Sequence, residues 1–246
     1  MEFSGFLKRF RRDSPKLDCQ FIRRGGWLGS NLETSFRSPT MPLHRLVEDR
    51  ARITNRAGHR PLWSGYNTVS NYPQSTQDSR TSDQVRTEAL MGRFYSWLAK
   101  QRQSKAIVEF GTAFGVSGMY WLAGLDGGHL YTFEPNRDWA ELAEKNLAAV
   151  SPNFTLTKDT FEEAGPKTVK HSSVDIAFID AIHTSEFVDR QYAILKPLMR
   201  PGGLILFDDI NFSDDMAACW KRISEESYLV ASAKFGARVG IIELPS

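Results

Sequence analysis

Residues 106–118 read AIVEFGTAFGVSG, and this stretch decides the fold that the chain can adopt. The apolar run Ala106–Phe110 has the composition of a parallel strand that is buried on both faces. Gly111 and Gly115 then mark a turn, because glycine allows backbone angles and close approaches that a Cβ atom would prevent. A helix is predicted to continue through residues 119–124. In open α/β sheets, a strand, a glycine turn and a helix in this order form the usual site of nucleotide-like ligands.

The spacing of the glycines narrows the class of ligand. A dinucleotide site has the pattern G-x-G-x-x-G, but Ala113 and Val116 stand at its second and third glycine positions, so a pyrophosphate would meet side chains. The pattern that remains is E-x-G-x-x-x-G-x-S, formed by Glu109, Gly111, Gly115 and Ser117. It resembles the first motif of class I S-adenosylmethionine (SAM) methyltransferases, whose ligand carries no phosphate. By this resemblance Glu109, Gly111, Gly115 and Ser117 would bind the cofactor. A purely structural turn is the alternative.

Strands and helices alternate along the rest of the chain. A helix capped by Thr81 or Ser82 is expected to run to Gln101, ahead of the first strand. Further strands are predicted at residues 130–133, 154–157, 174–179 and 204–207, and a last pair at 228–235 and 239–244. The sequence therefore predicts an α/β fold with a Rossmann-like, seven-stranded, mostly parallel sheet that ends in an antiparallel hairpin.

Length and charge suggest two parts, an N-terminal extension over residues 1–80 and, by the resemblance, a methyltransferase domain over residues 81–246. Residues 1–60 hold 13 Lys and Arg against 6 Asp and Glu. The basic stretch 6–12 is expected to pack on a second subunit, which predicts a homodimer. A membrane surface, an acidic partner, nucleic acid and a transit peptide are the alternatives. Tyr66 and Tyr72 lie in a polar segment that is either a lid over the site or a surface loop.

The remaining composition points to an ordinary protein of the cytoplasm. Cys19 and Cys219 lie far apart without metal-type spacing, which is typical of reduced thiols. The sequence contains no apolar run of the roughly 20 residues that a transmembrane helix needs.

Acidic residues follow the predicted strands, at the edge where ligands gather in open parallel sheets. Glu134 follows the glycine turn by about the 20 residues at which an acid reaches ribose hydroxyls in nucleotide-binding folds. Asp159 and Thr160 resemble the segment that contacts adenine, although they also suit a helix cap. Ser117, or N–H groups at the start of its helix, would bind the carboxylate of methionine. The alternative for Glu134 is that it is an acid at a strand end that contacts only solvent.

The motifs F-I-D-x-x-H, from Phe178 to His183, and F-D-D-I, from Phe207 to Ile210, would bring Asp180, Asp208 and Asp209 together. Three crowded carboxylates need a proton, a Lys or Arg, or a hard divalent cation to neutralise them.

These motifs resemble those of the metal-dependent small-molecule O-methyltransferases related to catechol and caffeoyl-coenzyme A enzymes. The branch that includes macrolide-sugar O-methyltransferases and cephalosporin-hydroxylase-like proteins is closer still. The resemblance covers residues 82–244. It implies that Asp180, Asp208 and Asp209 bind Mg²⁺ or Mn²⁺, that Asp180 also borders the cofactor, and that His183 is the general base. The alternatives are a helix-capping role for Asp208 or Asp209 and a structural hydrogen bond for His183.

The resulting expectation is an enzyme that transfers a methyl group from SAM to a hydroxyl of a small-molecule, natural-product acceptor. A divalent metal would orient and acidify the hydroxyl, with Asp180 and His183 as the catalytic residues. Two other functions are open: methylation of nucleic acid, which the basic N-terminus favours but which is the weaker reading, and a SAM-binding scaffold without transferase activity.

Overall fold

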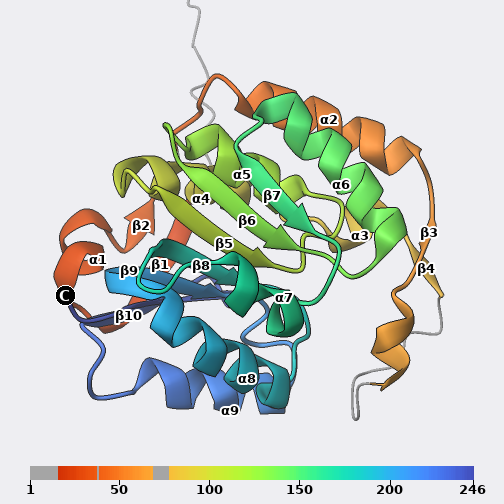
Figure 1. Cartoon of the computed structure of the whole chain (residues 1–246). Helices are drawn as coiled ribbons and strands as arrows, with labels where there is room; N and C mark the ends of the chain where they lie inside the picture. The colour runs from red at the N-terminus through yellow and green to blue at the C-terminus, as the bar shows by residue number, and fades with distance from the viewer. Residues whose placement is uncertain (1–15, 38, 69–77) are drawn as a thin grey trace, which may run out of the picture.

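The computed structural model describes residues 16–37, 39–68 and 78–246, and a nine-stranded sheet runs through this part of the chain (Figure 1). In spatial order the strands are β2 (Ser35–Phe36), β1 (Leu17–Arg23), β10 (Ala231–Phe235), β11 (Val239–Glu243), β9 (Met199–Phe207), β8 (Val174–Ile179), β5 (Ala106–Phe110), β6 (His129–Phe133) and β7 (Phe154–Thr157). Neighbouring strands from β9 to β7 are parallel, and those from β2 to β9 are antiparallel. The predicted α/β class and the C-terminal hairpin are confirmed.

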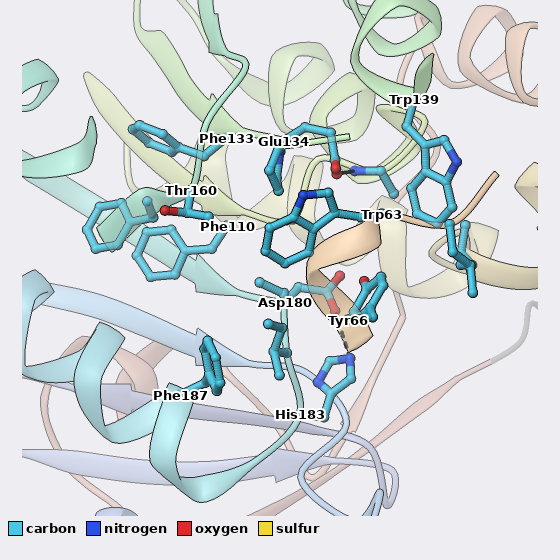
Figure 2. A pocket seen from close by; sticks show the side chains of 18 of the residues that line it. Trp63, Tyr66, Phe110, Phe133, Glu134, Trp139, Thr160, Asp180, His183 and Phe187 are labelled. Atoms are coloured by element: carbon cyan, nitrogen blue, oxygen red, sulfur yellow. Dashed lines mark hydrogen bonds and ion pairs between the residues drawn. The ribbon is translucent and has the colours of Figure 1, made fainter. Parts of the chain in front are cut away.

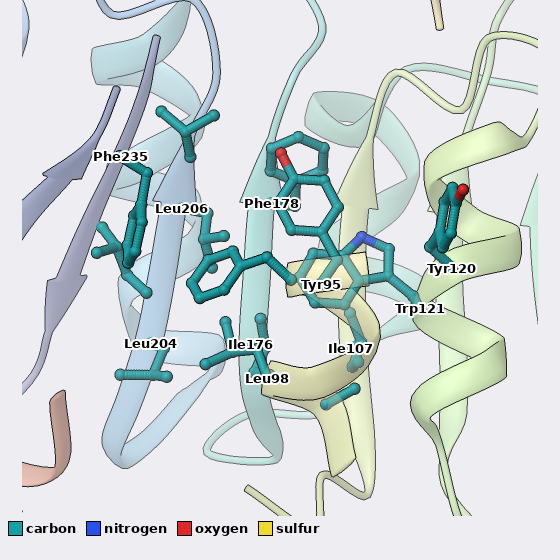
Figure 3. Close-up of a cluster of buried hydrophobic side chains, with 14 of the residues drawn as sticks. Tyr95, Leu98, Ile107, Tyr120, Trp121, Ile176, Phe178, Leu204, Leu206 and Phe235 are labelled. Atoms are coloured by element: carbon teal, nitrogen blue, oxygen red, sulfur yellow. The ribbon is translucent and has the colours of Figure 1, made fainter. Parts of the chain in front are cut away.

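Helices cover both faces of the sheet, which explains why its central strands are mostly apolar. On one face lie α1 (Gly26–Asn31), α2 (His44–Arg56), α4 (Ala89–Gln101), α5 (Val116–Gly124) and α6 (Arg137–Val150). On the other lie α7 (Phe161–Thr168), α8 (Ser185–Leu195) and α9 (Asp214–Ser224), with the short helix η2 (Lys196–Leu198) after α8. Figure 3 shows the core of the first face, where Tyr95 stacks on Trp121 with ring centres 4.6 Å apart beside Phe178.

The predicted count of seven strands is wrong by two, because the N-terminal extension adds β1 and β2 to the sheet. β1 pairs with β10 from Cys19, opposite Phe235, to Arg23, opposite Ser232. The carboxylate of Glu243 on β11 also accepts hydrogen bonds of 2.9 Å from the backbone N–H groups of Trp27 and Leu28. Strands β1 and β2 of the extension therefore belong to the same sheet as the strands after residue 80.

The helix expected from Thr81 or Ser82 to Gln101 is broken into two. The short helix α3 (Ser82–Val85) begins with a capping box, in which the backbone N–H of Thr81 donates to the side chain of Gln84 at 2.7 Å. Arg86 is in extended conformation, and α4 starts only at Ala89. The break lets residues 85–87 lie against the glycine turn instead of inside a helix.

Two short segments complete the extension near the carboxyl ends of the parallel strands. These are the ribbon of β3 (Arg60–Pro61) and β4 (Ser79–Arg80), and the short helix η1 (Ser64–Thr68). The side chain of Asn136, after β6, donates to the backbone oxygen of Pro61 at 2.8 Å. This bond fixes the extension to the edge of the sheet.

Strand register places the carboxyl ends at one level. Phe110, the last residue of β5, lies opposite both Phe133 of β6 and Ile179 of β8, and Ile179 lies opposite Phe207 of β9. The residues that follow these strands therefore share one edge, as the sequence predicts for Glu134 and Asp180.

The glycine turn can be tested by giving Gly111 a side chain. Its φ is +81°, and a Cβ atom there would lie 2.2 Å from the backbone oxygen of Asp180. Gly127 has a similar φ of +66° with no described atom within 4 Å of the same position. We expect Gly127→Ala to lower the free energy of unfolding by about 1–2 kcal/mol, the cost of left-handed backbone. Gly111→Ala should cost clearly more in the same urea titration. Equal losses would show that the close approach to Asp180 is not a packing constraint.

Candidate active site

A cavity of about 1040 Å³ opens at the carboxyl edge of the parallel strands (Figure 2). Its walls come from the glycine turn, the ends of β6, β8 and β9, the start of α7, the hairpin between β10 and β11, and the extension. The volume lies at the upper end of the range of small-molecule sites, so there is room for more than one compact ligand. Aromatic side chains line much of it, namely Trp63, Tyr66, Phe110, Phe133, Trp139, Phe161, Phe187 and Phe212.

The glycine turn forms one wall of this cavity. The N–H groups of Gly111 and Thr112 both donate to the backbone oxygen of Phe133 at 3.1 Å, which ties the turn to β6. Gly115, with φ +82°, precedes α5. A Cβ atom added to it would lie 3.1 Å from Cα of Ala143. Between the two glycines, Ala113 has a positive φ of +46° and faces the cavity. Both glycines predicted for the turn are thus required by its geometry.

Glu134 is held firmly at the wall next to this turn. Its carboxylate accepts hydrogen bonds of 2.8 Å from the backbone N–H groups of Ala113 and Asn136. Burial raises the pKa of Glu134 to about 7, although these two bonds oppose the shift. A carboxylate in this state gains from additional donors such as hydroxyl groups. Glu134 therefore lines the cavity, and its contact with ribose stays a prediction.

Glu109 lies behind the turn and does not line the cavity, contrary to its expected contact with the cofactor. It is fully buried on β5, where the hydroxyl of Thr132 donates to it at 2.8 Å. Burial raises the pKa of Glu109 to about 7, and the neighbouring hydroxyls of Ser117 and Thr132 oppose the shift. Ser117 lines a small pocket beside the main cavity, together with Gly111 and Asp180. Glu109 therefore supports the turn from below.

The segment after β7 enters the cavity through Thr160 and Phe161, and Asp159 stays outside. Asp159 is exposed, and its carboxylate accepts a bond of 2.8 Å from the N–H of Thr160. The ring of Phe161 stacks on Phe110 with ring centres 3.8 Å apart and meets the edge of Phe133 at 5.3 Å. These three rings form an apolar platform beside Glu134, while Asp159 serves the local turn.

Asp180, Asp208 and Asp209 do come together, and Arg238 lies among them. The guanidinium of Arg238 donates to both oxygens of Asp208, from Nε at 2.9 Å and from Nη2 at 2.7 Å. Its Nε also lies 2.9 Å from Oδ1 of Asp209. The sequence allowed a Lys or Arg as the neutralising group but did not identify Arg238, which belongs to the turn between β10 and β11.

This arrangement does not fit a divalent cation as it stands. Three of the four oxygens of Asp208 and Asp209 already accept from or face Arg238. Asp180 is partly buried beside Asp208, and desolvation followed by this neighbouring charge raises the pKa of Asp180 well above its ordinary value. The described residues also contain no group of three His, Cys, Asp or Glu side chains arranged around a metal position. The predicted ligands are adjacent, but their charges are compensated by Arg238.

His183 faces the same acids from the loop after β8. Its Nε2 lies 3.4 Å from Oδ2 of Asp209 and 3.8 Å from Oδ1 of Asp180. The ring of Phe212 covers it, with ring centres 5.4 Å apart. Burial lowers the pKa of His183, although Asp209 and Asp208 oppose this. A neutral imidazole that borders a cavity and contacts an acid is suited to accept a proton.

The N-terminal extension supplies the wall opposite the sheet. In Figure 2 the indole of Trp63 is drawn between Glu134 and the pair formed by Asp180 and His183. Tyr66 packs against Trp63 in an edge-to-face contact of 5.7 Å. Tyr66 thus lines the cavity, and its role as a lid stays a prediction. Tyr72 and the basic stretch 6–12 lie outside the described residues. Trp63 was not identified from the sequence, where it stands in a segment without periodicity.

Part of the sequence is similar to known proteins. Residues 108–210 match the family described as a methyltransferase domain. A protein of Mycobacterium avium with the name "Putative O-methyltransferase" is 31% identical over 121 residues, which are 47% of this chain and 53% of that protein. The chain thus spans about half the length of such curated relatives. "Probable caffeoyl-CoA O-methyltransferase 3" of Dictyostelium discoideum is 24% identical, and the match covers 72% of this chain and 74% of that protein.

Solved structures share the fold. The O-methyltransferase of Bacillus cereus in complex with S-adenosylhomocysteine (SAH) gives a TM-score of 0.59 at 18% identity, over 89% of this chain and 96% of that one. The O-methyltransferase TomG of Streptomyces achromogenes, involved in tomaymycin synthesis, was solved in complex with SAM. It gives a TM-score of 0.57 at 21% identity, over 66% of this chain and 82% of that one. At these identities the likeness shows the fold. In the described part of the chain, no helix combines the length and apolar character needed to cross a bilayer.

The protonation state of His183 is directly measurable. Because burial is the largest influence, we expect NMR titration of its ring to give a pKa below the ordinary value of 6.5, so that the imidazole is neutral at pH 7. The spectrum of His183→Asn identifies the resonance. A pKa above 6.5 would show that the charges of Asp208 and Asp209 outweigh burial.

Proposed function

Because residues 108–210 match the family described as a methyltransferase domain, we propose that the protein transfers a methyl group from SAM to a hydroxyl group of a small-molecule acceptor. One observation carries this proposal. Glu134, next to the glycine turn, and His183, next to the three acids, border the same cavity from two different strand ends. A donor held at the first residue and an acceptor held at the second would meet between them.

The residues around Glu134 fit the donor. Glu134 would accept hydrogen bonds from two ribose hydroxyls, and the platform of Phe110, Phe133 and Phe161 would pack against adenine. The small pocket at Ser117 lies at the start of α5, where backbone N–H groups favour the carboxylate of methionine. When bound, SAM supplies a methyl group on a positively charged sulfur, which a nucleophile can attack without a further activating group.

His183 would act on the acceptor. An alcohol or phenol is a weak nucleophile at neutral pH, and removing its proton as the C–O bond forms makes the attack possible. The imidazole of His183 accepts that proton, and Asp209 at 3.4 Å stabilises the imidazolium. The aromatic walls hold the two reactants in line and exclude water, so that positioning supplies much of the rate. No step of this proposal passes through Mg²⁺ or Mn²⁺, because Arg238 engages Asp208 and Asp209.

A natural-product acceptor agrees with the wide aromatic cavity and with the names of two similar proteins, one involved in tomaymycin synthesis and one named for caffeoyl-CoA. We propose that residues of the extension, Trp63 and Tyr66 among them, contact this acceptor. A homodimer and a cytoplasmic location, both expected from the sequence, are further parts of the proposal. The assay that tests the whole is formation of SAH from SAM with a panel of hydroxylated metabolites. Absence of turnover with every class of acceptor, despite SAM binding, would favour the scaffold.

Removal of the charge of Glu134 should weaken donor binding. We expect Glu134→Gln to raise the Kd for SAH about 10-fold or more, because the amide accepts ribose hydroxyls less well and its N–H₂ group opposes the backbone donors. Isothermal titration calorimetry measures this. Asp159→Asn is the control, since Asp159 is exposed and outside the cavity, and its affinity should match that of the parent. An unchanged Kd for Glu134→Gln would remove Glu134 from the donor site.

Removal of the imidazole of His183 should affect turnover and leave donor binding intact. We expect His183→Ala to lower kcat by about 100-fold or more, the usual contribution of a general base. The Kd for SAH should stay within about twofold. His129→Gln is the control, because His129 begins β6 and lies at the opposite edge of the sheet. A variant His183→Ala with parental kcat would exclude His183 as the base.

A further inference from the structure

Arg238 is the cation of the cavity wall that lies beside His183 and the acids. It is half-exposed and lines the cavity together with His183 and Asp180. Its hydrogen bonds and ion pairs with the described residues use Nε and Nη2. The two N–H groups of Nη1 and one of Nη2 are therefore available to a ligand in the cavity, since a guanidinium carries five donors.

The fold fixes Arg238 in this position. It stands in the turn of the hairpin formed by β10 and β11, and β11 is the direct neighbour of β9, the strand that ends just before Asp208. The backbone oxygen of Arg238 accepts a hydrogen bond of 3.0 Å from the N–H of Ile210, the residue after the acid pair. Both the main chain and the side chain of Arg238 are thus tied to the same loop.

Arg238 and Asp208 form a bidentate, charge-assisted ion pair, which is a strong interaction. Asp208 is buried, and its two oxygens meet Nε and Nη2 as a parallel pair of charge-assisted bonds. Removing one partner would leave a buried carboxylate without a counter-charge, which is strongly unfavourable. A divalent cation could reach Asp208 and Asp209 only by displacing this fork.

From this geometry we propose that Arg238 is the permanent cation of the acceptor site, in the place where a metal-dependent enzyme would hold its ion. The inference rests on the proposed function for its chemistry, although the position of Arg238 does not depend on it. The free N–H groups of Arg238 donate to the acceptor oxygen, orient it toward the donor and stabilise the negative charge that develops on it. The oxygen forms its bond to the methyl carbon as the bond from that carbon to sulfur breaks. The hydroxyl proton passes to His183, and SAH leaves.

Metal binding tests this assignment without depending on any acceptor. Electron paramagnetic resonance of Mn²⁺ should show no binding to the parent protein and clear binding to Arg238→Ala, in which Asp180, Asp208 and Asp209 are uncovered. Arg222→Ala is the matched control, because Arg222 pairs with Asp189 at 2.6 Å outside the cavity. It should bind no Mn²⁺. Binding of Mn²⁺ by the parent protein, or by neither the parent nor Arg238→Ala, would overturn the proposal.

Two further measurements complete the test. SAH affinity of Arg238→Ala should equal that of the parent, which shows that the variant is folded. Should it not fold, Arg238→Gln, which keeps some of the volume and N–H donors, replaces it in the same titration. Once an acceptor is known, kcat/KM should be unchanged by EDTA and should fall about 100-fold in Arg238→Ala, as for the loss of an oxyanion donor. Loss of parent activity in EDTA would overturn the role of Arg238, whereas lack of any turnover would bear on the proposed function alone.

Discussion

The arrangement of the site depends on the register of four parallel strands. β5, β6, β8 and β9 end at one level because Phe110, Phe133, Ile179 and Phe207 are aligned across the sheet. A shift of one residue in any pair would move the following loop by about 3.3 Å and turn its side chains to the other face. The buried apolar residues on both faces prevent such a shift. Core packing therefore determines where Glu134 and Asp180 lie, although neither contributes to the core.

The part of the site that follows directly from this register could be predicted from the sequence. Each strand of the parallel half is a short apolar run, and the acid after it is visible in the printed sequence. For Glu134, Asp180 and Asp208 it was enough to know that the strands are parallel. Glu109 was misplaced by the same reasoning, because it lies within its strand and not after it. Its side chain points to the helix side, where Ser117 and Thr132 surround it.

Other residues could not be found this way, because their positions depend on contacts distant in sequence. Arg238 reaches Asp208 only because β11 pairs with β9, and Trp63 lines the cavity only because Asn136 holds Pro61. β1 has a weak signal: Leu17, Cys19 and Phe21 alternate with more exposed residues. This alternation was hidden in a segment rich in charged residues. The extension is therefore part of the sheet at one end and part of the cavity wall at the other.

The two buried acids near the glycine turn connect stability with ligand binding. The pKa of each is raised from the ordinary value of a glutamate to about 7. The folded protein thus binds more protons than the unfolded chain between about pH 4.5 and 7, and this contribution to stability is lost as the pH rises through that window. At neutral pH the carboxylates carry an unfavourable charge. For Glu109, the hydroxyls of Ser117 and Thr132 offset part of it permanently. Within the part of the chain that the structure describes, Glu134 accepts from two backbone donors and borders the cavity, so it is the acid whose compensation a hydroxylated ligand can complete. Burial of Glu134 therefore lowers the stability of the folded protein at neutral pH, and it also favours binding of the ribose hydroxyls of the proposed donor.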